Sequence, residues 1–592
     1  MLQHEWIFAE SSEKGPPDEA ALFLSKSTGL GRLAATVCVN RGIATPEAVK
    51  TFLNPRLDSL THPFQVRDMQ LAAQEILASQ ERSEPARLRV FTDYDVDGTT
   101  GAALLTWFFR DLGFRFDVVQ PDRFRDGYGL QVRAVEEAHR DGVEILITVD
   151  CGITSFDAAE KARELGIRLI IVDHHQIDPA KGLPSAFAIV DPQRSDDESG
   201  LKQLCGCALA FYLCMGVRML GRERGFFASR GLSEPNLKSL LDLVVIATAA
   251  DMVPLTGDNR TLVKHGLDVL RNTEKPGLRE LMKVAGIEVK SVGPSNLGFA
   301  LGPRINASGR MGSAETAYRV LTTKDPEEGR RLALELEGVN TERAELQNRI
   351  WDEVRSRVET GLEKGLFSHS VVVGDPGWHE GVVGIVASKV TEHFHRPAVI
   401  LAIREDGIAK GSVRSYGGCN ILEVLHLSKG HLLGYGGHKY AAGLSLRPEQ
   451  IEAFAADFNR TVASQVPEER KHPIRIESYC ELEELDLKAL EEIERLAPFG
   501  PGHPEPVFAV RAKVEQQSIL KGRHVKLRLG SARTRGFEGI WFNAAERLDD
   551  TLLMEKSAQS GNPCEFAGIP EINRFLGKSS PTLRIKSARR VE

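Results

Sequence analysis

Residues 87–98 read RLRVFTDYDVDG, residues 144–152 read EILITVDCG and residues 167–175 read IRLIIVDHH. Each segment begins with an apolar run without alternation of apolar and polar residues, which is typical of a strand buried on both faces of a parallel sheet. The runs AFAIV (186–190) and LDLVVIATAA (241–250) continue the series, and helical patterns separate them. The sequence therefore predicts an α/β domain built on a parallel sheet.

The size and composition of the chain are those of a soluble globular protein with several domains. Its 592 residues are too many for one hydrophobic core. The content of 42% hydrophobic and 27% charged residues is ordinary for folded domains. We expect a cytoplasmic protein without a membrane partner, because no apolar leader and no long uncharged run occurs. We also expect a monomer.

The net charge limits how the chain could bind nucleic acid, and the spacing of its cysteines excludes two kinds of cysteine-based site. The formal net charge is −7, so any nucleic acid must bind a local basic surface or be held through metal ions. The eight Cys include no CxxC pair, which excludes a zinc ribbon and a disulfide framework. Cys205, Cys207 and Cys214 stand in an apolar stretch, where we expect buried thiols.

Changes of pattern divide the chain into five parts. Thr45 followed by Pro46 predicts the start of a short helix in the first part. Apolar residues that recur every three, four or seven positions from Leu332 to Val358 predict a long helix or a helix pair. The last part is rich in strand-like runs and fits a small β-barrel. We expect a helical lead-in at 1–60, an α/β domain at 61–313, a connecting helix at 314–365, a smaller α/β domain at 366–465 and a β-barrel at 470–592.

Acidic and imidazole side chains follow the predicted strands where each one ends. In open parallel sheets ligands bind beyond the carboxyl ends of the strands, so these segments would deliver their side chains to one crevice. Any single Asp after a strand is equally compatible with the N-cap of the next helix, but four acidic strand ends in one domain indicate a site. The residues are Asp93, Asp95, Asp97, Asp150, Asp173, His174, His175 and Asp251.

Converging carboxylates need a positive charge among them, because alone they would repel one another and bind protons. Carboxylate oxygens with one or two His nitrogens suit Mg²⁺ or Mn²⁺, and the number of acids favours two ions over one. A metal pair about 3.5–4 Å apart is a standard device for phosphoester hydrolysis. The pattern DxDxDG at Asp93 also opens a calcium-binding EF-hand loop, but the twelfth position is Leu104 rather than Glu, which excludes that interpretation.

Four motifs together resemble the DHH phosphoesterase superfamily: DYDVDG (93–98), VDCG (149–152), VDHH (172–175) and ADMVP (250–254). Within it, the chain resembles the bacterial RecJ family of single-strand-specific 5′→3′ exonucleases over nearly its whole length and in the same order. His503 is one departure, because the family's pattern has Asn there. The segments that carry this resemblance are NRGIATPEAVKTFLNP (40–55), PDRFRDGYGL (121–130), GPRINASGRMG (302–312), GWHEGVVGIVASKV (377–390), GYGGHKYAAG (434–443) and APFGPGHPEPVF (497–508).

The resemblance implies a fold, a reaction and a ligand set. The fold would be a parallel-sheet DHH domain, a DHH-associated domain and a C-terminal OB-fold. The reaction would be two-metal hydrolysis of single-stranded DNA to 5′-mononucleotides in recombination and repair, with a single-stranded-DNA-binding protein and a RecQ-type helicase as partners. Asp150, His174 and His175 would be catalytic, with His175 nearest the scissile phosphate. The implied ligands are Asp93 and Asp95 for the first Mg²⁺ or Mn²⁺, Asp97, His174 and Asp251 for the second, and Asp150 as the bridge.

Gly-rich segments are candidates for binding the nucleotide end. GPRINASGRMG places two guanidinium groups near a Gly-rich turn, which is good phosphate-binding chemistry, and KGSVRSYGG and GGHKYAAG permit close approach to the backbone. The residues alone favour surface turns, whereas the resemblance implies a pocket that accepts a 5′ phosphate and fixes the cut one nucleotide inward. The candidates are Arg304, Asn306, Ser308, Arg310, Lys410, Ser412, Arg414, Ser415 and His438.

The predicted barrel is locally basic although the net charge of the whole chain is negative. Between residues 511 and 540, eight basic residues oppose two acidic ones, which leaves a local charge of +6. With Phe537, Trp541 and Phe542 nearby, such a face would attract phosphates and stack bases. Aromatic side chains in the barrel core and charges on a solvated face explain the same pattern.

Two other functions fit part of the sequence. A DHH phosphoesterase acting on short oligonucleotides or cyclic dinucleotides would share the metal site, but such enzymes are typically shorter and lack the OB-fold. A non-catalytic DNA-binding scaffold would have lost its acids, whereas every expected ligand type is present in this chain.

Overall fold

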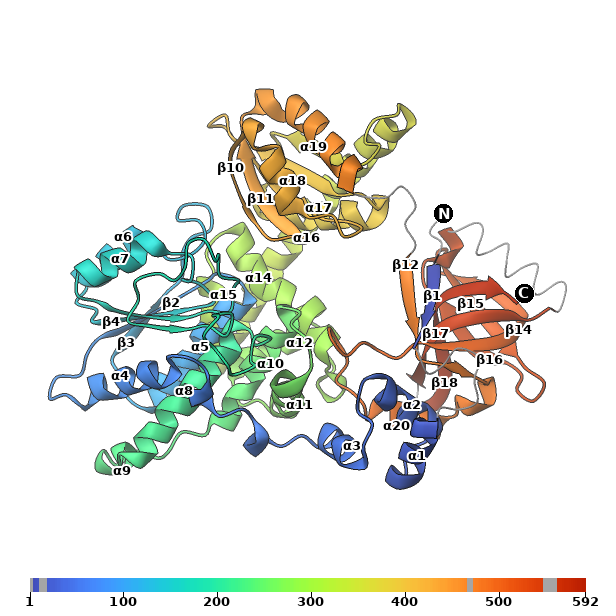
Figure 1. The fold of residues 1–592 in the computed structure, drawn as a ribbon, viewed down its shortest axis with the longest axis horizontal. Coiled ribbons are helices and arrows are strands. Elements are labelled where there is room, and N and C mark those ends of the chain that lie inside the picture. The colour runs from blue at the N-terminus through green and yellow to red at the C-terminus, as the bar shows by residue number, and fades with distance from the viewer. Residues whose placement is uncertain (1–3, 10–18, 466–471, 547–561, 576, 592) are drawn as a thin grey trace. The chain divides into compact units, whose positions relative to one another are not determined.

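The computed structural model describes residues 4–9, 19–465, 472–546, 562–575 and 577–591. Two compact units make up the chain: residues 61–253 with 265–470, and residues 1–60 with 254–264 and 471–592. The first unit contains two α/β sheets and the second a β-barrel (Figure 1). The predicted fold class is confirmed. The expected domain start at residue 470 lies outside the described residues.

The first sheet is fully parallel, in the order β3-β2-β4-β5-β6. Every residue of β2 and β4 is buried, because helices cover both faces of the sheet. Helices α6 (Val132–Arg140) and α7 (Phe156–Glu164) lie on one face, and α4 (Met69–Glu81), α5 (Val96–Asp111) and α8 (Gly206–Glu223) on the other (Figure 1). The strands are β2 (Leu88–Thr92), β3 (Phe116–Val119), β4 (Ile145–Val149), β5 (Arg168–Val172) and β6 (Ala188–Val190).

Residues 241–250 form a helix, α10 (Leu241–Ala250), so the strand predicted there is wrong. Eight of its ten residues are buried, and the helix therefore shows no polar face. A short run that is apolar on all sides does not distinguish a buried helix from a buried strand. Asp251 is consequently the C-cap of a helix rather than the residue after a strand.

The segment GPRINASGRMG also differs from its prediction, because it forms helix α14 (Gly302–Met311) instead of a turn. Its glycines serve close packing: a Cβ at Gly309 would lie 2.7 Å from the carbonyl oxygen of Tyr94. Beyond α15 (Glu315–Thr322), the predicted long connection is one helix, α16 (Pro326–Glu363). Asp325 caps α16 by accepting the amide of Glu327 at 2.9 Å.

The second sheet of this unit has the order β10-β11-β9-β8-β7, in which only β7 and β8 are parallel. Helix α17 (Glu380–Phe394) makes the crossover between these two strands, as a parallel pair requires. The remaining elements are β7 (Val371–Asp375), β8 (Ala398–Ile403), β9 (Ala409–Arg414), β10 (Leu432–Gly437), β11 (Ala441–Leu446), α18 (Ile421–Leu427) and α19 (Ile451–Gln465).

The second unit is built on a closed barrel. Pairing runs β14-β15-β16-β18-β17 and returns to β14, so the sheet closes on itself. Helices α1 (Glu19–Thr28), α2 (Arg32–Asn40) and α3 (Pro46–Leu53) contribute to the barrel's core. The predicted cap of α3 is confirmed, because Thr45 Oγ1 accepts the amide of Ala48 at 3.1 Å. The barrel strands are β14 (Phe508–Leu520), β15 (His524–Gly530), β16 (Phe537–Trp541), β17 (Cys564–Phe575) and β18 (Lys578–Arg590).

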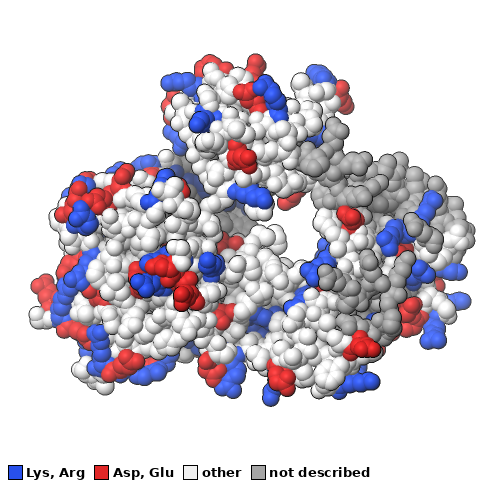
Figure 2. Space-filling view, viewed as in Figure 1, with Lys and Arg blue, Asp and Glu red and all other residues white. Residues whose placement is uncertain are grey.

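The surface shows acidic and basic side chains interspersed over the face seen in Figure 2. Binding of a polyanion therefore depends on local clusters, as the net charge implies. The eight cysteines are buried and form no disulfide, which confirms the buried thiols predicted at Cys205, Cys207 and Cys214. In the described part of the chain, every helix falls short of the length or apolarity that spanning a bilayer requires.

Candidate metal centre

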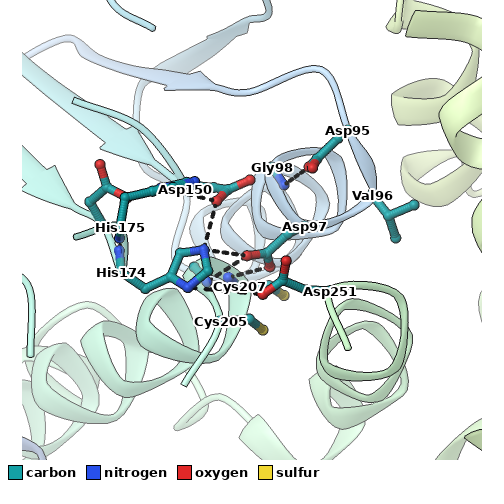
Figure 3. Close-up of polar contacts among 12 residues, drawn as sticks. Asp95, Val96, Asp97, Gly98, Asp150, His174, His175, Cys205, Cys207 and Asp251 are labelled. Atoms are coloured by element: carbon teal, nitrogen blue, oxygen red, sulfur yellow. Dashed lines mark hydrogen bonds and ion pairs between the residues drawn. The ribbon is translucent and has the colours of Figure 1, made fainter. Parts of the chain in front are cut away.

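The carboxyl ends of β2, β4 and β5 meet the first turns of α5 and α8, and acidic side chains gather at this edge (Figure 3). Asp93 directly follows β2. Asp95 is the N-cap of α5, because its Oδ1 accepts the amide of Gly98 at 3.1 Å. A Cβ at Gly98 would lie 2.3 Å from the carbonyl oxygen of Asp93, so only glycine lets the loop turn this tightly.

Asp97 lies in the first turn of α5 and is 2% exposed. Its Oδ2 accepts the amide of Gly206 at 2.6 Å and its Oδ1 the amide of Cys207 at 2.8 Å (Figure 3). These amides open α8, where the helix dipole favours a negative charge. Burial nevertheless raises the pKa of Asp97, and the charge of His174 opposes that shift.

Asp150 follows β4 with a φ of +62°, which is uncommon for a residue with a side chain. Gly206 lies directly against it, since a Cβ there would be 2.9 Å from the Cα of Asp150. Oδ1 of Asp150 lies 3.1 Å from Nε2 of His174. Burial and the charges of the neighbouring carboxylates raise the pKa of Asp150 well above its usual value.

His174 connects Asp150 to two further acids. Its Nε2 lies 3.7 Å from Oδ2 of Asp97, and its Nδ1 lies 3.9 Å from Oδ2 of Asp251. Burial and the charge of Asp97 raise the pKa of Asp251 to about 8. The end of α10 thus supplies the acid that the sequence had assigned to a strand end.

Among the described residues, three groups place their ligand atoms within 4.8 Å of one another. Oδ1 of Asp93 is buried and has no hydrogen-bond partner, and burial and the charge of Asp95 raise the pKa of Asp93 to about 8. An unpaired oxygen among like charges is what a divalent cation would satisfy, so these residues fit a hard metal ion. The groups are Asp93, Asp95 and Asp150; Asp97, His174 and Asp251; and Asp150, His174 and His175.

Asp173 does not belong to any of these groups and has another role. Its Oδ1 accepts the amides of His174 at 2.8 Å and His175 at 3.2 Å, as well as Nδ1–H of His175 at 2.7 Å. Its Oδ2 accepts the amide of Ile153 at 3.0 Å. Although burial opposes the shift, the hydrogen bond from His175 holds the pKa of Asp173 below its usual value.

Sequence reasoning missed three residues near this centre. Asp191 follows β6, is fully buried, and has its pKa raised to about 8 by burial and by the charge of Asp173. The pattern of an acid after a strand was present there too. The hydroxyl of Tyr128 lies 3.3 Å from Nε2 of His175. Arg123 is the third, and only folding brings the loop that carries it to the site.

The phosphate-binding candidates divide into three sets. Arg304 is paired with Glu337 at 2.5 Å, and Oδ1 of Asn306 accepts the amide of Val96 at 3.1 Å. The hydroxyls of Ser308 and Ser415 donate to backbone carbonyls. These four side chains have structural partners.

Arg310, Arg414 and Ser412 form the second set. Burial and the charge of Arg123 lower the pKa of Arg310 to about 10, and the same two causes lower that of Arg414. A Cβ at Gly384 of α17 would lie 3.0 Å from Oγ of Ser412 and 3.2 Å from Nη2 of Arg414. Arg123, Arg310 and Arg414 form no ion pair with a carboxylate among the described residues.

The remaining two candidates lie in the second sheet. Partial burial and the charge of His175 lower the pKa of His438, so His438 lies within electrostatic range of the first sheet's site. Lys410 instead pairs with Glu380 at 3.6 Å.

In the barrel, Phe537 and Trp541 are buried in the core, whereas Phe542 is 49% exposed. Of the aromatic side chains expected to stack bases, only Phe542 is available on the surface. Lys526 pairs with Glu538 and Arg511 with Glu565. A cavity of about 1340 Å³ lies among Arg511, Lys513, Arg535 and Arg589.

Three family models match separate parts of the chain. The model of the DHH family, N-terminal domain, matches residues 87–248, that of the DHHA1 domain matches 366–464, and that of the RecJ OB domain matches 476–587. The single-stranded-DNA-specific exonuclease RecJ of Bacillus subtilis is 33% identical over 578 residues, which cover 97% of this chain and 70% of that protein. RecJ of Escherichia coli is 37% identical over 518 residues, 86% of this chain and 88% of that protein.

The structural comparison agrees with the sequence comparison. The crystal structure of RecJ in complex with Mn²⁺ from Thermus thermophilus matches with a TM-score of 0.81 and 28% identity, covering 100% of this chain and 80% of that one. The structure of RecJ from the same organism in complex with Mg²⁺ matches with a TM-score of 0.75. Since RecJ relatives are 33–37% identical along almost the whole chain and the RecJ OB domain model matches its last part, the chain belongs to the RecJ family.

Proposed function

We propose that the chain is an exonuclease specific for single-stranded DNA, which releases mononucleotides from the 5′ end by metal-dependent hydrolysis. The observation that carries the proposal is the convergence of five carboxylates and His174 at one edge of the parallel sheet. The relatives named as single-stranded-DNA-specific exonucleases, and the RecJ structures with Mn²⁺ and Mg²⁺, support the same activity and the same class of cofactor.

The proposed centre takes two divalent ions, Mg²⁺ or Mn²⁺. Ions held there would lower the pKa of a water molecule and neutralise charge on the phosphate. The chain fixes its own ligands: Asp97 by two amides of α8, and Asp150 by the packing of Gly206. The proposed assignment is Asp93 and Asp95 to one ion, Asp97, His174 and Asp251 to the other, and Asp150 to both.

His175 is proposed to contact the scissile phosphate. Its Nδ1–H donates to the buried carboxylate of Asp173, which fixes the plane of the imidazole. Nε2, on the opposite side of the ring, lies 3.3 Å from the hydroxyl of Tyr128 and is the ring nitrogen proposed to face the substrate. This arrangement orients a polar group toward the reacting phosphate before the substrate binds.

Arg123, Arg310 and Arg414 are proposed to bind the 5′ phosphate. Three guanidinium groups without carboxylate partners repel one another, and burial together with the charge of Arg123 lowers the pKa of Arg310. A phosphate would offset this repulsion and accept their hydrogen bonds, assisted by Ser412 and the N-terminal turn of α17. A fixed end would set the cut one nucleotide inward and would give the 5′→3′ direction.

The barrel is proposed to bind the strand beyond the cut, through Phe542 and the basic residues of β14 and β15. We further propose that the protein acts in the cytoplasm as a monomer in DNA recombination and repair. A RecQ-type helicase would supply the single strand, and a single-stranded-DNA-binding protein would be its other partner. These assignments follow from the family resemblance.

The test is digestion of a 5′-phosphorylated 60-mer, labelled at either end, with Mg²⁺ or Mn²⁺. We expect immediate release of the 5′ label as mononucleotide, and no release from a blunt duplex, in chelator, or with Asp150→Ala. Asp352→Ala, which removes an exposed acid on α16, is the matched control and should digest normally.

Other outcomes would reject the proposal. Cleavage of di- to pentanucleotides with survival of the 60-mer would identify an enzyme of small substrates and leave the barrel unexplained. Binding without cleavage under every metal condition would identify a scaffold. Release of the 3′ label first would refute the role of the arginines as a 5′-phosphate site.

A further inference from the structure

Tyr128 combines two properties that are seldom found together. Its side chain is 45% exposed, yet its hydroxyl lies 3.3 Å from Nε2 of His175. The two rings meet edge to face with centroids 5.9 Å apart. Burial and the charges of Asp173 and Asp150 raise the pKa of the hydroxyl, so the phenol stays neutral. The tip of the side chain thus belongs to the catalytic centre while its ring faces solvent.

The backbone, rather than packing of the ring, holds Tyr128 in place. Gly127 and Gly129 on either side both have a φ of +80°, which side-chain-bearing residues rarely adopt. The carbonyl of Tyr128 accepts from Nε2 of Gln131 at 2.9 Å, and the amide of Leu130 donates to Oγ of Ser155 at 3.2 Å. The loop thus uses two left-handed glycines to hold a half-exposed aromatic ring beside His175.

The same loop carries Arg123, five residues earlier, whose guanidinium lies 5.3 Å from the centre of the Tyr94 ring. If the 5′ phosphate binds Arg123 and the scissile phosphate contacts His175, the first nucleotide lies between them. Its base then reaches the exposed face of Tyr128. Stacking on an aromatic side chain tolerates any base, because every base has a π-face.

We infer that Tyr128 is the stacking platform for the base of the 5′-terminal nucleotide, and that its hydroxyl positions His175 against the phosphate being cleaved. This inference rests on the proposed exonuclease function. It makes Tyr128 a residue that joins binding of the terminal base to the orientation of the imidazole.

The two roles can be separated by two substitutions. Tyr128→Phe keeps the ring and removes the hydroxyl, so kcat should fall several-fold with KM unchanged. Tyr128→Leu removes the ring as well, so KM should also rise about tenfold, in line with the loss of one base–aromatic stack. Phe23→Leu, which removes a 61% exposed ring from α1, is the matched control and should leave both constants unchanged.

Two probes report on stacking itself. A 5′-phosphorylated oligonucleotide with 2-aminopurine at its first position, bound in chelator, should lose fluorescence on wild-type protein and Tyr128→Phe but not on Tyr128→Leu. An abasic first nucleotide should lower kcat/KM about tenfold for wild type and Tyr128→Phe, and should cause no further loss in Tyr128→Leu.

Equal abasic penalties in wild type and Tyr128→Leu, or unchanged quenching in Tyr128→Leu, would overturn the role of the ring. An unchanged kcat in Tyr128→Phe would overturn the role of the hydroxyl. Failure of the wild type to digest an unmodified 5′-phosphorylated 60-mer would instead refute the exonuclease function, so the two failures are distinguishable.

Discussion

Oδ1 of Asp173 accepts Nδ1–H of His175 at 2.7 Å and the backbone amide of the same residue at 3.2 Å. One carboxylate oxygen therefore fixes both the main chain and the ring of His175. Asp173 is fully buried and lies outside the groups that could hold a metal ion. The first residue of the DHH motif thus orients the third, while His174 between them faces Asp97 and Asp150.

Asp173→Asn is expected to reduce activity while leaving metal binding nearly intact. The amide nitrogen that replaces one carboxylate oxygen cannot accept a hydrogen bond, and the negative charge that attracts Nδ1–H of His175 is lost, so the imidazole is held less firmly. Loss of such an orienting partner typically costs about 10–100-fold in activity. Steady-state kinetics and a Mn²⁺ titration by thermal shift measure the two effects. A kcat within threefold of wild type would contradict this role, and Asp406→Asn in the turn before β9 is the exposed control.

Gly206→Ala is expected to disable the metal centre, because the added methyl group would collide with Asp150. The new Cβ would lie 2.8 Å from Cβ of Asp150, so either Asp150 or the start of α8 must move. Such overpacking typically costs about 1–3 kcal/mol of stability, and activity should fall because Asp97 and Asp150 both depend on this contact. Urea unfolding and the 60-mer assay report the two losses.

Gly338→Ala is the matched control for that substitution. Gly338 lies in α16 and a Cβ there meets nothing within 4 Å. Alanine should stabilise the helix by about 0.5–1 kcal/mol and leave activity unchanged. Equal activity of the Gly206 and Gly338 variants would show that close packing at Asp150 is not needed.

The strands of the first sheet were predictable because a strand that is buried on both faces has a continuous run of apolar residues in the sequence. Asp93, Asp150 and His174 follow those strands, so their convergence could be inferred from the topology of parallel sheets. Helix α10 leaves a similar apolar run, and the sequence could not distinguish the two. The position of Asp251 was therefore expected for the wrong structural reason.

Other contacts of the site could not be predicted, because the residues that form them are distant in sequence. Arg304 and Arg310 lie six residues apart in one motif, but only Arg304 finds a carboxylate, Glu337 of α16. Nothing local to the motif indicates this pairing. The amides of Gly206 and Cys207 that bind Asp97 also leave no signal, because a backbone donor is the same in every residue.

Divalent metal ions are expected to stabilise the chain by relieving repulsion among its acids. Burial and the charges of neighbouring carboxylates raise the pKa values of Asp93 and Asp150, and a cation among these acids would stabilise their ionised forms. A ligand at 100 times its Kd stabilises the folded state by about 2.7 kcal/mol. Mn²⁺ should therefore raise the Tm, chelator should reverse the rise, and Asp150→Ala should show a much smaller one. An equal rise in Asp150→Ala would place the binding elsewhere.

His503 is expected to make the stability of the barrel unit depend on pH. It is 4% exposed, its Nδ1 accepts from Nη1 of Arg41 at 2.8 Å, and its Nε2–H donates to the carbonyl of Leu496 at 3.1 Å. Burial and the charges of Arg41 and Arg260 lower the pKa of His503 from 6.5 to about 3. A neutral imidazole with one acceptor and one donor makes the contacts that an Asn amide can make, which explains how His occupies this position.

Between pH 6.5 and about 3 the unfolded chain binds a proton at His503 that the folded chain does not. The free energy of unfolding therefore falls as the pH falls through this window, by up to about 1.4 kcal/mol per pH unit from this residue alone. His503→Asn should keep the fold and lose this part of the slope, so the difference between variant and wild type should grow in the variant's favour from pH 7 to pH 4.5. Urea unfolding at a series of pH values measures it, with the exposed His139→Asn as control. Parallel pH profiles for wild type and His503→Asn would show that His503 is protonated in the folded chain, contrary to its buried contact with Arg41.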